Sequence, residues 1–118
     1  MPNYQYIEVS QQNDVTVVQV LNPTVQDRLL INELGDELID FVEREKPQKL
    51  LIGFERVAYC SSEMIGGLIR ARRRVLNGGG SLKLCSLRPT VRRIFVITHV
   101  EGTVFDIYET AEEAIAAF

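Results

Sequence analysis

The sequence has few of the residues that build metal or disulfide sites. Its 118 residues include two cysteines, one histidine and no tryptophan. Cys60 and Cys85 each lie in an apolar segment, and no Cys or His pair has the spacing of a zinc site. This pattern favours two buried, reduced thiols. We therefore expect no metal and no cofactor.

Long apolar runs and a strong charge of one sign are also missing. No stretch approaches the roughly 20 apolar residues of a membrane-spanning helix. The first residues, Met1–Tyr4, lack the basic and then apolar layout of a secretory signal. The formal net charge is −3, from 13 basic and 16 acidic residues, which argues against nucleic acid as the main partner. We expect a cytoplasmic protein with no membrane and no nucleic-acid partner.

What the chain does contain is an alternation of strand-like and helix-like segments. Apolar residues make up 46% of the sequence, enough for one core in a single domain, 1–118. Period-2 and continuous apolar runs predict strands, and a 3.6-residue apolar period predicts helices. The predicted strands are Tyr4–Val9, Val15–Leu21, Lys49–Gly53, Leu82–Cys85 and Val104–Tyr108. The predicted helices begin after Asp27, cover Ser62–Leu76 and Pro89–Ile97, and begin again after Thr110.

The order of these segments predicts the topology. After a first hairpin, strands and helices alternate, so short right-handed crossovers give a largely parallel sheet with the first strand at one edge. Asp27 and Thr110 are typical helix caps. The glycines 78–80 follow a helix, so they indicate a left-handed helix stop and not a phosphate-binding loop. Periodicity leaves open whether the helices cover one face of the sheet or both.

No group of residues predicts a catalytic centre. His99 is the only histidine, and no neighbouring residue pairs it with a nucleophile. The carboxylates Glu33, Asp36, Glu37 and Asp40 recur at helical spacing, which is typical of a solvated helix face. We therefore expect no enzyme activity.

Two serines open the second predicted helix. From the residues alone, Ser61 or Ser62 is an N-cap, a role worth roughly 1 kcal/mol, and Glu63 adds a favourable interaction with the helix dipole. We expect Ser61 at the helix N-terminus with its hydroxyl reaching solvent. Further along, Arg70, Arg73 and Arg74 share a face with Gly66, Gly67 and Asn77, opposite Leu68. That face is either simply solvated or a basic docking surface.

Two motifs together carry a family resemblance. One is the strand Leu50–Ile52 followed by Ser61-Ser62. The other is Gly78-Gly79, a strand, and the segment 87–95 (Leu-Arg-Pro-Thr-Val-Arg-Arg-Ile-Phe). From Val15 to its end, the chain resembles the STAS domain of bacterial anti-sigma factor antagonists. It departs from many phosphorylated members at Cys60, where they have aspartate, at Glu63, where they have glycine, and at Leu21–Thr24, which replaces their turn.

The resemblance implies an α/β fold, a STAS-like (SpoIIaa-like) sandwich. Its central mixed, mostly parallel sheet would have four to five strands, with about four helices. The resemblance also implies an anti-sigma factor antagonist, which binds an anti-sigma serine-protein kinase of the GHKL ATPase type and so frees the sigma factor. Phosphorylation of Ser61, or alternatively of Ser62, would end that binding. The residues then expected to contact the partner are Asn22, Thr24, Asp27, Cys60, Ser61, Ser62, Glu63, Gly66 and Arg70. The departures from the family pattern leave open the alternative that the chain is an unphosphorylated scaffold module of a signalling complex. We also expect that the chain can form a weak homodimer.

Overall fold

Seven strands and four helices form within residues 3–118, the part of the chain that the computed structural model describes. In chain order they are β1 (Ile7–Gln12), β2 (Val15–Val20), β3 (Thr24–Val25), α1 (Arg28–Glu45), β4 (Lys49–Gly53), β5 (Tyr59–Cys60), α2 (Glu63–Asn77), β6 (Ser81–Cys85), α3 (Pro89–Ile97), β7 (Ile107–Tyr108) and α4 (Ala111–Ala117).

Five of the strands form one mixed sheet in the order β1-β2-β4-β6-β7. β1 pairs with β2 in antiparallel fashion, and the other pairings are parallel. The predicted topology, mostly parallel with the first hairpin strand at an edge, is confirmed. β3 and β5 form a separate two-stranded parallel sheet, which the sequence did not predict.

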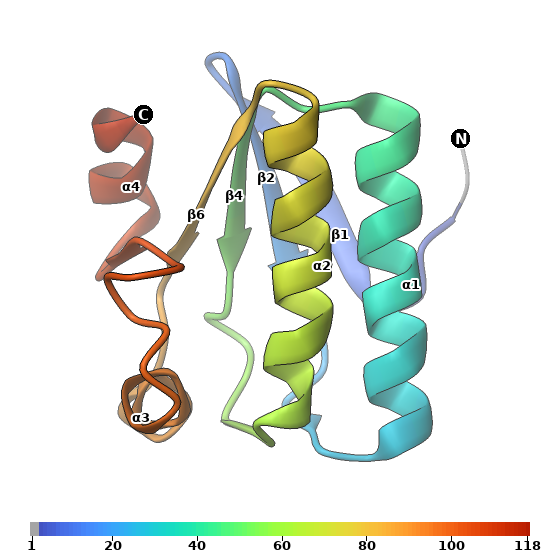
Figure 1. The fold of residues 1–118 in the computed structure, drawn as a ribbon, viewed down its shortest axis with the longest axis vertical. Coiled ribbons are helices and arrows are strands. Elements are labelled where there is room, and N and C mark those ends of the chain that lie inside the picture. Colours follow the sequence, from blue (N-terminus) through green and yellow to red (C-terminus); the bar gives the residue numbers. More distant parts are fainter. Residues whose placement is uncertain (1–2) are drawn as a thin grey trace.

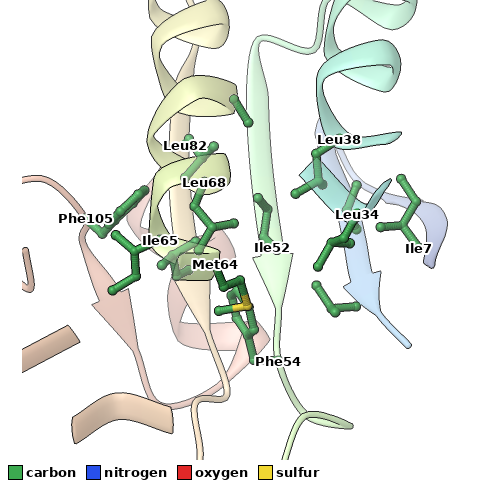
Figure 2. Close-up of a cluster of buried hydrophobic side chains, with 14 of the residues drawn as sticks. Ile7, Leu34, Leu38, Ile52, Phe54, Met64, Ile65, Leu68, Leu82 and Phe105 are labelled. Carbon is green, nitrogen blue, oxygen red and sulfur yellow. The ribbon is translucent and has the colours of Figure 1, made fainter. Parts of the chain in front are cut away.

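The helices cover both faces of the sheet, which answers the question that periodicity left open. α1 and α2 lie side by side along one face, and α4 lies away from them, beyond β6 (Figure 1). The larger core lies under α1 and α2, where Leu34, Leu38, Ile52, Met64 and Leu68 meet (Figure 2). A smaller core on the opposite face joins Val15, Val17, Leu51 and Cys85 to Ala114 of α4. Burial of Cys60 and Cys85 as free thiols agrees with the sequence prediction.

The first strand begins three residues later than predicted, at Ile7. The backbone N–H groups of Gln5 and Tyr6 donate to the Glu37 carboxylate, each at 2.9 Å, and so they do not continue the ladder. The Tyr4 hydroxyl donates to Asp40 at 2.9 Å, and that of Tyr6 donates to Glu33. The expectation that these α1 carboxylates form a solvated face was therefore wrong for Glu33, Glu37 and Asp40, since they hold the N-terminal segment.

The predicted caps hold at α1 and α4. The side chains of Asp27 and Thr110 accept from the N–H groups of Leu30 and Glu113, each at 3.1 Å. The predicted glycine stop after α2 is confirmed: Gly78 is the C-cap residue, with an ordinary φ of −85°, and Gly79 directly after it takes the left-handed φ of +84°.

The last predicted strand is shorter than expected and covers only Ile107–Tyr108. None of the helices within residues 3–118 has the length and apolar character needed to cross a membrane. No cluster of three or more potential metal-ligating His, Cys, Asp or Glu residues occurs in that same range.

Candidate functional site

The serine pair lies where two connections meet at one end of the molecule. β3 and β5 pair in parallel, with Thr24 opposite Tyr59 and Val25 opposite Cys60. The carbonyl oxygen of Pro23 accepts from the N–H of Ala58 at 2.7 Å. This small sheet places the connection before α1 beside the segment that opens α2. The two groups of predicted partner-contacting residues, around 22–27 and 60–63, thus lie side by side.

Ser61 is fixed through its backbone, and its side chain points inward. Its N–H donates to the carbonyl oxygen of Val25 at 2.9 Å, and its own carbonyl oxygen accepts from Met64 N–H at 3.2 Å. Its Oγ atom is buried and has no hydrogen-bond partner within residues 3–118. The expectation of a solvent-facing hydroxyl was therefore wrong. Pairing with β3 continues as far as this residue and turns the side chain away from the surface.

Ser62 is the exposed hydroxyl of the pair. It is the N-cap residue of α2 and has helical dihedral angles, φ −63° and ψ −21°. A capping side chain normally needs an extended backbone at this position to reach the N–H groups of the first turn. Accordingly neither serine makes the predicted side-chain cap.

Charged side chains connect the N-termini of α1 and α2. Arg28, the first residue of α1, lies 3.6 Å from Glu63, the first residue of α2, measured from Nε to Oε2. Both side chains are largely exposed, so this ion pair contributes little to stability. Asp27 is exposed but already accepts from Leu30 N–H, so its carboxylate is committed to the cap of α1. The N-terminal ends of two helices thus flank the serine pair, and such ends favour anions.

Cys60 does not reach the surface. Its side chain is fully buried in the larger core, and burial raises the pKa of its thiol to about 11. A partner that binds at this end can contact Thr24 and Ser62, which are exposed, and the half-buried Asn22. The predicted contact of Cys60 with the partner would therefore fall to its backbone, because its thiol belongs to the core.

The predicted arginine face of α2 is only partly available to a partner. Gly67, expected on that face, is buried against Gly35 of α1, and that expectation was wrong. Arg74 forms an ion pair with Glu43 of α1. Gly66 and Arg70 are exposed, as expected, and Arg70 extends over the Gly35–Gly67 contact: a Cβ added to Gly35 would lie 3.2 Å from its Nη2.

Two exposed apolar side chains at this end of the molecule were not among the predicted contact residues. Tyr59, two residues before Ser61, keeps 46% of its surface exposed, and Leu29, in the first turn of α1, keeps 65%. Strands of two residues carry no periodicity, so no pattern singled out β5 or showed that Tyr59 points outward. The exposure of Leu29 could have been predicted, because this residue lies one position before Leu30 and outside the apolar stripe of α1.

The fold and this end of the molecule define a class: a small α/β domain that presents a serine pair at a helix N-terminus. A family model described as the STAS domain matches residues 6–114. The chain belongs to the STAS domain family.

Solved structures agree with that assignment. An anti-sigma-factor antagonist (STAS) domain protein from Planctomyces limnophilus has a TM-score of 0.83 at 25% identity, over 94% of this chain and 96% of its own. An anti-sigma factor antagonist from Mycobacterium paratuberculosis has a TM-score of 0.78 at 22% identity, over 94% and 91%. The anti-sigma factor antagonist SpoIIAA, in its unphosphorylated form, has a TM-score of 0.73 at 18% identity, over 94% of each chain. The STAS fold predicted from the sequence is confirmed.

Proposed function

We propose that this chain is a cytoplasmic bacterial anti-sigma factor antagonist, a binding switch that performs no chemistry itself. In this proposal the unmodified domain binds an anti-sigma serine kinase of the GHKL ATPase type and releases the sigma factor. The observation that carries it is the serine pair at the N-terminus of α2, held by the β3–β5 pairing beside Thr24 and Asn22. Solved relatives of the same fold are described as anti-sigma factor antagonists.

The proposed switch is one phosphate on the serine pair. Phosphorylation adds about −1.5 to −2 charges at neutral pH. Free N–H groups and the dipole at a helix N-terminus accommodate such an anion, so the domain stays folded while the surface offered to the partner changes. Arg28, which already lies near Glu63, is a cation that a new phosphate would attract.

Ser61 is the proposed acceptor, and Ser62 is the alternative. The Ser61 hydroxyl has no hydrogen bond to break within residues 3–118. Turning Oγ outward therefore needs only local rearrangement. Ser62 needs none, since it is exposed already.

Arg70 is a proposed contact for the partner. It is exposed and, among the described residues, makes no salt bridge. Such a rim cation acts mainly on the association rate of an acidic partner.

The second candidate is an unphosphorylated STAS scaffold in a signalling complex. The burial of Ser61 Oγ favours it. The sequence departures at Cys60 and Glu63 favour it too.

Phosphate transfer from the cognate kinase separates the two functions. The protein is incubated with this kinase and ATP, and its mass is measured. The switch predicts one added phosphate, lost in Ser61→Ala and kept in Ser81→Ala, an exposed serine outside the site. If Ser62→Ala alone abolishes the transfer, the alternative acceptor is correct. Ser61→Asp should weaken partner binding with an unchanged melting temperature. A stable complex without any phosphate transfer would favour the scaffold.

A further inference from the structure

The outer edge of the main sheet is an unprotected strand. β1 has six residues, and its antiparallel register with β2 is complete from Ile7–Val20 to Gln12–Val15. Edge strands are usually shielded by lysine, proline, bulges or short length. β1 has none of these, and Glu8 is its only charged residue. The opposite edge strand, β7, has only two residues.

The hydrogen-bond pattern identifies which backbone groups point outward. Leu21 N–H donates to the Tyr6 carbonyl oxygen at 3.0 Å, so that carbonyl group points toward β2. Antiparallel pairs alternate, which makes the pairs of Glu8, Ser10 and Gln12 hydrogen-bonded to β2 as well. The N–H and C=O groups of Ile7, Val9 and Gln11 therefore face the free edge.

Only part of this edge is open to another molecule. Ile7 is almost fully buried, whereas Val9 keeps 37% of its surface exposed and Gln11 is exposed. Both line a groove of about 420 Å³ between β1 and the C-terminal end of α1, which also includes Tyr4 and Phe41. β1 lies on the α1 side of the sheet, behind α1 and α2 in the view of Figure 1. Val9 and Gln11 are thus two accessible residues with four unpaired backbone groups.

We propose that this edge binds a second copy of the chain, with β1 paired to β1 in antiparallel fashion about a two-fold axis at Ser10. Val9 of each copy then pairs with Gln11 of the other, which forms four backbone hydrogen bonds. The axis is perpendicular to the sheet, so the two sheets join into one and the α1–α2 layers lie on the same face. This is an isologous contact, the usual kind in homodimers.

Two other symmetric registers would pair an accessible residue of the edge with one that is not suited to pairing. An axis at Val9 pairs Gln11 with the buried Ile7, and an axis at Gln11 pairs Val9 with Asn13, a turn residue with φ of +58°. The axis at Ser10 also avoids repulsion between like charges. It places Glu8 opposite Gln12 of the other copy, a carboxylate facing an amide, and no two like charges face each other. The strand is therefore complementary to itself, which points to a second copy as the occupant.

The interaction is expected to be weak, because four backbone bonds and one short strand bury far less surface than a permanent dimer. It leaves the serine pair out of the contact, so it goes beyond the proposed switch. Its test needs neither kinase nor phosphate, and failure of either proposal leaves the other standing.

Sedimentation over low micromolar to millimolar concentration tests the dimer. The wild type should show a concentration-dependent monomer–dimer equilibrium. Gln11→Pro removes an outward N–H without breaking the β2 ladder, and it should weaken dimerisation at least about tenfold. Gln11→Ala loses the same side chain, including its bond to Thr16, and keeps the N–H, so it should dimerise like the wild type. A wild type that is monomeric throughout, as expected if a strand of another protein occupies the edge, overturns the proposal.

Cross-linking tests the register and does not depend on the stability of the proline variant. Ser10→Cys places two thiols opposite each other at the axis and should form a disulfide-linked dimer under mild oxidation. Gln12→Cys lies on the same strand and the same face of the sheet, and its counterpart is Glu8, so it should cross-link at least about tenfold more slowly. Cys60 and Cys85 are buried and give no background. Equal rates for the two variants overturn the register and with it the proposal.

Discussion

Gly67 of α2 and Gly35 of α1 face each other where the two helices pack, and a Cβ built on Gly67 would lie 3.4 Å from the Cα of Gly35. The two helices share the most extensive helix–helix contact of the described structure. Because Arg28 and Glu63 begin these helices beside the serine pair, the glycine contact sets the spacing of the candidate site.

Leucine at position 67 should separate the helices. We expect Gly67→Leu to lower the free energy of unfolding by about 1–3 kcal/mol, as overpacked positions do. Its neighbour supplies the control, since a Cβ at Gly66 meets nothing within 4 Å. Gly66→Leu should raise stability by up to about 1 kcal/mol through helix propensity. Urea denaturation measures both, and equal destabilisation of the two variants would contradict the packing.

Removing the Ser61 hydroxyl should not destabilise the domain. The buried Oγ has no partner, and an unpaired buried hydroxyl is itself unfavourable, so Ser61→Ala should leave the free energy of unfolding unchanged or raise it by about 1 kcal/mol. Ser62→Ala should change it by less than about 0.5 kcal/mol, since the side chain makes no cap bond. A loss above about 1 kcal/mol in Ser61→Ala would mean that its hydroxyl is hydrogen-bonded.

The Cys60 thiol should make stability depend on alkaline pH. Burial raises its pKa from 9.0 to about 11, so the folded state holds the proton more tightly than the unfolded state. That stabilisation is complete below about pH 9 and is lost as the pH rises toward about 11. Cys60→Ala should reduce this loss, as measured by urea denaturation at several pH values. The native thiol should also resist alkylation at pH 8, and rapid labelling of folded protein would contradict its burial.

The hydrogen bonds between the N-terminal segment and α1 at Gln5 and Tyr6 should depend on the Glu37 carboxylate. Glu37→Ala removes the acceptor of both the Gln5 and Tyr6 N–H groups, so their amide exchange should become about tenfold faster, as expected for bonds to an exposed charged group. Asp36→Ala, one residue earlier and exposed, should leave both rates unchanged. Unchanged exchange in Glu37→Ala would show that these amides are protected by other contacts.

Features set by neighbours in the chain could be predicted from the sequence. The central strands β2 and β4 are recognisable as largely apolar runs, which strands buried on both faces tend to be, and β6 is recognisable by the alternation of Leu82, Lys83 and Leu84. Asp27 and Thr110 cap helices through groups only three residues away. The motifs around Ser61 and Pro89 were sufficient to indicate the STAS family, and the family match agrees.

Contacts between distant segments were decided only by the tertiary structure. Glu37 binds the N–H groups of Gln5 and Tyr6 and so ends their pairing in the first strand, although more than 30 residues separate them. Gly67 is buried because α1 lies against it, and α2 considered alone gave no sign of that contact. The inward hydroxyl of Ser61 follows from a hydrogen bond to Val25. The sequence alone determined the order of the strands and helices and the place of the serine pair, because these follow from local periodicity and motifs. Packing between segments far apart in the chain decided which hydroxyl, glycine and strand edge reach the surface.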